Sequence, residues 1–145
     1  NCVFFFESSA EENKEKDIYE YVEGVPQELI GQQLFTWDAA QRETNKLWKE
    51  LPDIDVYYND FQRIMDSMPW DNEDMRYQQF LIRNNMLFPG FRYPWWAFVG
   101  IGEECNLWSK NSYNNTSARY SQFLKNSWLR IEYHKRLAFS VRCKR

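Results

Sequence analysis

The sequence has few glycines and prolines, five of each in 145 residues, and only one histidine. Gly100 and Gly102 lack the third glycine and the strand–helix context of a nucleotide-binding loop. The single imidazole, His134, argues against a metal site built from histidines and leaves one candidate base for a catalytic triad. We therefore expect a protein that is not an enzyme, with no catalytic residue, no metal and no cofactor.

Long apolar runs and an excess of positive charge are also missing. No run approaches the roughly 18 apolar residues of a membrane-spanning helix. The apolar residues 3–6 are too few for a span and lack the basic flank of a signal peptide. The net charge is −3, whereas non-specific nucleic-acid binding depends on Lys and Arg contacts with phosphates. We expect no membrane span and no nucleic-acid partner.

Cysteine is scarce and odd in number. Cys2, Cys105 and Cys143 leave at least one thiol unpaired, and their spacing matches no zinc-binding pattern. One disulfide could join Cys143 to either of the other two. The sequence does not determine which of these disulfides forms. It therefore does not determine whether the protein resides in an oxidising or a reducing compartment.

Aromatic residues are abundant, at 19% of the chain. They bury large areas in a core and also supply rigid contact surface for ligands. Residues 36–48 are predicted to form a helix that Thr36 caps, and a second helix is predicted from Asp53 or Asp55 to about residue 68. A third, shorter helix is expected within residues 71–83.

After residue 87 the pattern changes to short strands separated by turn residues. The predicted strands cover residues 95–101, 106–109, 118–123, 128–133 and 137–143. Helices followed by strands indicate an α+β domain, with two or three helices packed beside an irregular antiparallel sheet.

Residues 110–136 are dense in Asn, Ser, Tyr, Lys and Arg. Tyrosine gives rigid contact area at low entropic cost, and Ser and Asn add adaptable hydrogen bonding, as in recognition surfaces. An ordinary polar sheet face with loops would have a similar composition. The segment is therefore a candidate binding surface that composition alone does not establish.

A set of short motifs resembles the FISUMP family, the Fibrobacter-type major paralogous domain of surface proteins in Bacteroidetes and their relatives. The most specific motif is the ending Phe-Ser-Val-Arg-Cys at residues 139–143. The supporting motifs lie at Gly31 and at residues 34–40, 51–52, 88–92 and 107–109. The ending is also similar to that of variable proteins which diversity-generating retroelements diversify in gut bacteria and their phages.

This resemblance implies a C-type-lectin-like fold, similar to formylglycine-generating enzymes, over residues 31–145. Residues 1–30 have no counterpart and are expected to form an N-terminal extension or linker. The sequence does not reproduce the cysteine pair that formylglycine-generating enzymes use for copper chemistry, so their activity is not carried over. A cysteine that the family often has before the Leu-Pro motif is also missing here.

The resemblance further implies a cell-surface, secreted or virion domain that binds a protein or glycan ligand on a host or neighbouring cell. The alternative is a structural or assembly protein of a phage particle or surface filament, which could form homo-oligomers. In the variable proteins the substitutions concentrate in the window that corresponds here to residues 110–137.

The resemblance also implies which side chains contact the ligand. The positions aligned with exposed, variable residues of the family are Tyr120, Gln122, Leu124, Leu129, Ile131, Tyr133 and His134. Lys110, Tyr113 and Asn115 on the preceding loop are expected to extend this surface. Hydrophobicity alone predicts instead that the strand face carrying Leu129 is buried, and we follow the resemblance in expecting it to be exposed.

Overall fold

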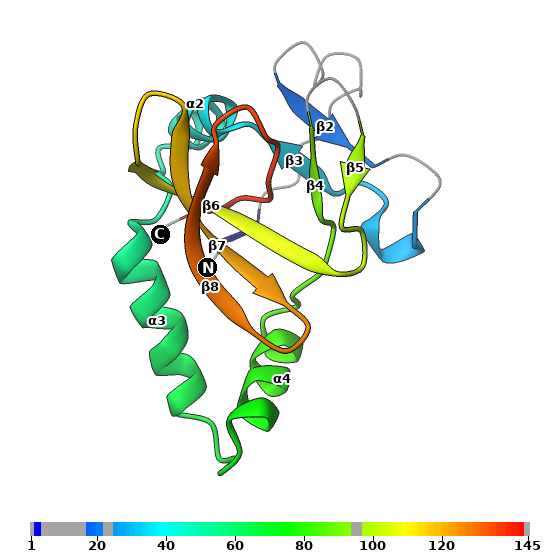
Figure 1. The fold of residues 1–145 in the computed structure, drawn as a ribbon, viewed down its shortest axis with the longest axis vertical. Coiled ribbons are helices and arrows are strands. Elements are labelled where there is room, and N and C mark those ends of the chain that lie inside the picture. The colour runs from blue at the N-terminus through cyan, green and yellow to red at the C-terminus, as the bar shows by residue number, and fades with distance from the viewer. Residues whose placement is uncertain (1, 4–16, 22–24, 94–96, 144–145) are drawn as a thin grey trace.

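The computed structural model describes residues 2–3, 17–21, 25–93 and 97–143, and it has a mixed α+β fold, which confirms the predicted class (Figure 1). In chain order the elements are β1 (Cys2–Val3), β2 (Ile18–Glu20), the 3-10 helix η1 (Gln27–Leu29), β3 (Gln33–Phe35), α2 (Trp37–Lys46), α3 (Ile54–Asp66), α4 (Glu73–Arg83), β4 (Phe91–Arg92), β5 (Phe98–Val99), β6 (Glu104–Ser112), β7 (Ser117–Leu124), β8 (Trp128–His134) and β9 (Arg142–Cys143).

The three predicted helices are confirmed as α2, α3 and α4, each slightly shorter than expected. Each begins after a side chain that accepts a hydrogen bond from a main-chain N–H of the first turn: Thr36, Asp53 and Asn72. Helix α2 ends at Lys46 rather than near residue 48, because Trp48 has a left-handed backbone with φ of +57°.

The cap of α3 makes an acid-dependent contribution to stability. Hydrogen bonding from the Asn111 amide, and then from main-chain N–H groups, lowers the pKa of Asp53 below 3.8. A carboxyl whose pKa is lower in the folded state than in the unfolded state stabilises the fold at pH values above its unfolded-state pKa. This stabilisation is lost as the pH falls through its folded-state pKa. We expect Asp53→Asn to lose less stability than wild type between about pH 5 and pH 2, measured by urea unfolding at each pH.

The control for this experiment is Asp71→Asn, which removes a carboxylate from an exposed turn. It should keep the wild-type dependence of unfolding free energy on pH. An Asp53→Asn variant with the same acid sensitivity as wild type would contradict the assigned role of this cap.

The largest sheet is antiparallel, with the strand order β6-β7-β8, and three two-stranded sheets surround it. Strands β7 and β8 confirm the predictions at 118–123 and 128–133. Strand β6 is longer than the predicted 106–109, because a bulge between Trp108 and Ser112 lets the pairing continue through Lys110.

Two strand predictions were only partly right. Residues 137–143 form a strand only at β9, because the preceding residues make isolated bridges to β3, β4 and β6. The predicted strand 95–101 is reduced to β5, and its first two residues lie outside the described part of the chain.

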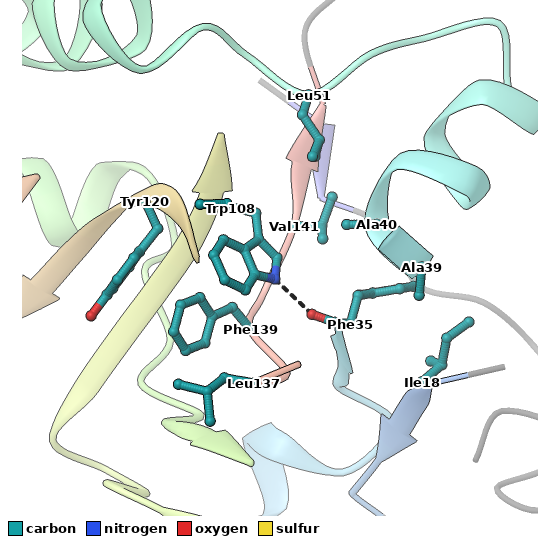
Figure 2. Packing of buried hydrophobic residues seen from close by; sticks show 11 residues of the cluster. Ile18, Phe35, Ala39, Ala40, Leu51, Trp108, Tyr120, Leu137, Phe139 and Val141 are labelled. Atoms are coloured by element: carbon teal, nitrogen blue, oxygen red, sulfur yellow. Dashed lines mark hydrogen bonds between the residues drawn. The ribbon is translucent and has the colours of Figure 1, made fainter. Parts of the chain in front are cut away.

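The sheet β6-β7-β8 packs on both faces because alternate side chains point to opposite sides. On one side Phe123 packs with Phe61 of α3 and Phe80 of α4. On the other, Trp108 and Tyr120 pack with residues from β3, α2 and the segment 137–141 (Figure 2). The indole Nε1 of Trp108 donates a hydrogen bond of 2.7 Å to the main-chain oxygen of Phe35 and ties β6 to β3 (Figure 2).

Part of the expected N-terminal extension belongs to the packed fold. Strand β2 pairs with β3, and Ile18, Tyr19, Tyr21 and Leu29 are buried in the core. The boundary predicted at residue 30 therefore needs correction, since residues 17–21 and 25–30 cover apolar surface that the later residues expose.

The cysteines occupy separate positions. The thiol of Cys105 is buried and free, so it is not the partner of Cys143. The antiparallel pairing of β1 with β9 sets the backbone of Cys2 opposite that of Cys143. Of the two pairings that the sequence left open, the fold excludes the one with Cys105.

Candidate functional site

Strand alternation brings six of the ten predicted site residues onto one side of the β7–β8 hairpin, and five of them are at least partly exposed. We call these five the hairpin face, and its members are Gln122, Leu124, Leu129, Ile131 and Tyr133. The register pairs Gln122 with Leu129, and the next pairs along are Tyr120 with Ile131 and Ala118 with Tyr133. The five side chains therefore form a continuous strip across two neighbouring strands.

Tyr120 lies on the same side of the hairpin, but it is buried, unlike the five residues of the hairpin face. Its side chain is only 2% exposed and lies between Trp108 and Phe139, with ring centroids 5.8 and 4.4 Å away. Burial is the main cause that raises the pKa of its phenol above the usual value. The prediction that Tyr120 is an exposed contact residue was wrong, because segment 137–141 covers this part of β7 (Figure 2).

The hairpin face is neither fully buried nor fully exposed. Leu129 and Ile131 are half-buried, and Ile131 packs against the core around Tyr120. Tyr133 is 44% exposed. The prediction of a buried face and the prediction of an exposed face were thus each partly right. Leu129 and Ile131 cover the core beneath them and are also partly accessible to solvent.

Two tyrosines from distant parts of the chain meet at one end of the hairpin face. Tyr93 follows β4 and makes a side-chain hydrogen bond with Tyr133, which is the main cause of the raised pKa of Tyr93. The Tyr93 ring also contacts Phe91 edge-on, at 5.3 Å between centroids. The core beneath therefore orients this aromatic pair.

The other end of the face is polar. The half-buried carboxylate of Glu104 in β6 accepts hydrogen bonds from Asn106 Nδ2 at 2.9 Å and from Gln122 Nε2 at 3.5 Å. The carbonyl oxygen of the Asn106 side chain is buried and has no hydrogen-bond partner. A carboxylate and two amides thus lie beside the apolar middle of the strip.

The opposite side of the hairpin holds it against helix α3. Trp128 stacks on Tyr58 with ring centroids 4.1 Å apart, and the guanidinium of Arg130 lies 4.7 Å from the centre of the Tyr58 ring. Arg130 also forms an ion pair with Asp55. These contacts give the hairpin face a rigid base, which favours binding because little order is then lost on association.

Three of the four other predicted residues lie away from the hairpin face. Lys110 is exposed beside the start of α3, where its main-chain N–H donates to Pro52 at 2.9 Å. Tyr113 lies under the guanidinium of Arg119, 5.6 Å from the ring centre, and Asn115 is in an exposed turn. His134 alternates to the opposite side of β8, where its Nδ1 accepts from the Arg136 N–H. The expectations that Lys110 and Tyr113 extend this surface and that His134 is part of it therefore need correction, and the expectation for Asn115 stays a prediction.

Sequence reasoning missed Tyr93 and Glu104 as neighbours of the site. Neither lies in segment 110–136, whose composition made it the candidate binding surface. The alternation of β6 could have placed Glu104 beside β7, but the contact of Tyr93 depends on the packing of β4 and could not be read from local pattern.

No family model, curated protein or solved structure matches the chain. Within residues 17–21, 25–93 and 97–142, no three His, Cys, Asp or Glu side chains are arranged to hold a metal ion. In the described part of the chain, every helix is too short or too polar to cross a membrane. The chemistry of the hairpin face itself is therefore the basis for a functional proposal.

Proposed function

We propose that this protein is a recognition domain of a cell surface, a secreted protein or a virion, and that it binds a protein or glycan ligand through the hairpin face. The observation that carries the proposal is the composition of that strip. Half-buried Leu129 and Ile131 lie between a tyrosine pair and an amide–carboxylate group. An apolar centre with polar groups around it is typical of specific binding sites.

The fold that we propose is C-type-lectin-like, of the FISUMP type. In support, residues from four of the motifs that suggested this family share one buried cluster: Phe35, Leu51, Trp108 and Phe139. Motifs that are far apart in the chain thus fulfil one structural role. The segment between the last two of them forms the hairpin, which is where the family places its variable surface.

The proposed activity is binding without catalysis. The side chains that meet on the hairpin face are two tyrosines, two amides, one carboxylate and aliphatic groups. The single histidine lies on the opposite side of β8. The position of the imidazole away from the hairpin face supports a binding role rather than histidine-based catalysis at this site.

We predict that the triple variant Gln122→Ala, Leu129→Ser, Tyr133→Ala loses ligand binding while staying folded. The ligands are taken from a glycan array and a protein array probed with wild-type protein. Removing central contact residues costs about 2 kcal/mol or more, so affinity should fall roughly 30-fold or more. Because none of the three is fully buried, circular dichroism should show a folded variant.

The matched control is Arg119→Ala with Glu132→Ala, two exposed residues on the opposite side of the same hairpin. It should bind each array ligand within about twofold of wild type. A ligand that binds the triple variant normally and the control weakly would place recognition on the other face.

The structural alternative is tested on the same proteins by size-exclusion chromatography. An assembly protein of a phage particle or filament should oligomerise through its apolar strip, and the triple variant should then be monomeric. A wild-type protein that is monomeric and binds an array ligand would support the recognition function and contradict the assembly function.

A further inference from the structure

The side chain of Arg142 in β9 is a buried cation. The residue is only 5% exposed, and its Nη2 donates to the main-chain oxygen of Asn84 at 2.7 Å, with the sulfur of Met86 4.0 Å away. Among the described residues, no ion pair is made by Arg142. One carbonyl oxygen and one weakly accepting sulfur therefore serve a group that has five N–H donors.

This arrangement is unusual because arginine does not lose its charge on burial. Its pKa is too high for neutralisation, so an unpaired guanidinium keeps the full desolvation cost. Buried charges in proteins are normally paired or hydrogen-bonded on most of their donors. An anion is the group that would complete this site.

A second buried donor lies close by. The hydroxyl of Tyr57 in α3 is buried and has no hydrogen-bond partner. Burial raises the pKa of Tyr57 above its usual value, and the nearby charge of Arg142 opposes that shift. Burial also raises the pKa of the Cys105 thiol to about 11, so the thiol is protonated at neutral pH. A hydroxyl without an acceptor, a guanidinium with one main-chain acceptor and a neutral thiol thus gather in one region.

A cavity of about 280 Å³ opens beside Arg142 and Cys105. Most of its wall is apolar, from Met86, Leu87, Leu107 and Val141, and Ser140 adds a hydroxyl. Leu107 and Cys105 point to the side of β6 opposite Trp108, so the cavity is separate from the hairpin face. Its lining combines one cation with aliphatic surface, and Gln32 and Asn85 add two amides.

We propose that this cavity binds a small carboxylic acid with an aliphatic body, whose carboxylate pairs with Arg142 while its chain fills the apolar part. This site goes beyond the proposed recognition function. A guanidinium presents parallel N–H groups that match the two oxygens of a carboxylate. A phosphate carries more charge than one cation offsets and would leave the apolar wall empty.

The size of the cavity suggests the length of the acid. At about 30 Å³ per water-sized group, 280 Å³ holds roughly nine heavy atoms. Hexanoate, with six carbons and two oxygens, is therefore a suitable probe. Hexylamine and hexan-1-ol have the same chain without the negative charge, and acetate has the charge without the chain.

The test measures the melting temperature of the whole chain with each probe at equal ionic strength. Hexanoate should raise it by roughly 4 °C or more at saturation, and acetate, hexan-1-ol and hexylamine should change it by much less. A hexanoate shift no larger than that of acetate or hexan-1-ol would overturn the proposal.

Two variants locate the effect. Arg142→Met removes the unpaired charge, so the ligand-free protein should melt at or above the wild-type temperature and should no longer respond to hexanoate. Leu87→Trp keeps Arg142 and fills the cavity from its half-buried wall, and it should also lose the response. An undiminished hexanoate shift in a folded sample of either variant would contradict the proposed site.

The free thiol gives an independent readout. Cys105 lines the cavity, so bound hexanoate should slow its alkylation by iodoacetamide several-fold, and hexylamine should not. The rate is followed by mass spectrometry of the peptide that contains Cys105. Equal protection by hexanoate and hexylamine would show that Arg142 does not select the charge of the ligand.

Discussion

Gly90→Ala is expected to destabilise the protein by about 3 kcal/mol or more, among the largest effects of any single methyl group here. Gly90 has φ of +72°, and an added Cβ would lie 2.0 Å from the main-chain oxygen of Val99 and 2.8 Å from the carbonyl carbon of Gly100. Both contacts are with backbone, which cannot rotate away. The N–H of Gly90 also donates to Glu104 at 2.8 Å, so the close approach is held in place.

Gly102→Ala is the matched control for this prediction. Gly102 also has a positive φ, +81°, but an added Cβ would meet no atom within 4 Å. It should cost about 1–2 kcal/mol from backbone strain alone. Urea unfolding of both variants separates strain from collision, and equal losses would contradict the packing of Gly90 between β5 and β6.

The second large effect is expected at the centre of the core. Trp108 is completely buried, contacts Tyr120 and Phe139, and donates its indole hydrogen bond to Phe35 (Figure 2). Trp108→Ala removes this packing and one of the two hydrogen bonds to the Phe35 main-chain oxygen, which still accepts from the Phe139 N–H at 2.9 Å. We expect a loss of about 3–5 kcal/mol in unfolding free energy, measured by chemical denaturation.

Trp48→Ala makes the same chemical change on the surface. Trp48 is 97% exposed, so its removal should change the unfolding free energy by no more than about 0.5 kcal/mol. If Trp108→Ala and Trp48→Ala had similar stabilities, Trp108 could not be the residue on which β3, β6 and segment 137–141 converge.

The elements that local sequence specifies were predicted well. Thr36, Asp53 and Asn72 each supply a capping oxygen at a helix start, and prolines follow two of the helices. The short runs between turn residues placed β7 and β8 within a residue of their observed ends. These signals depend only on neighbouring residues, which is why they could be read without a structure.

Features that depend on distant contacts were missed. Strand β6 has nine residues and a bulge, and the prediction ended it before the polar residues Lys110 and Asn111. Ile18 and Tyr21 belong to the core because β3 pairs with a segment that begins fifteen residues before it. No local pattern in an acidic, polar stretch indicates such a partner.

The candidate site shows the same division. The resemblance predicted Gln122, Leu124, Leu129, Ile131 and Tyr133 as contact residues, and strand alternation accounts for their position on one side of the hairpin. Alternation could not tell that Phe139 covers Tyr120, because it assigns a side and not a depth. The hydrogen bond between Tyr93 and Tyr133 likewise joins residues that are forty positions apart.

The central claim is that the hairpin face is a recognition surface. Its most direct test is to sequence the coding region across many isolates and compare codons 110–137 with the flanks. We predict that substitutions concentrate at the five hairpin-face positions and spare the buried Tyr120 and Phe123. Substitutions spread evenly along the chain, or equally frequent at Tyr120 and at Tyr133, would contradict the claim.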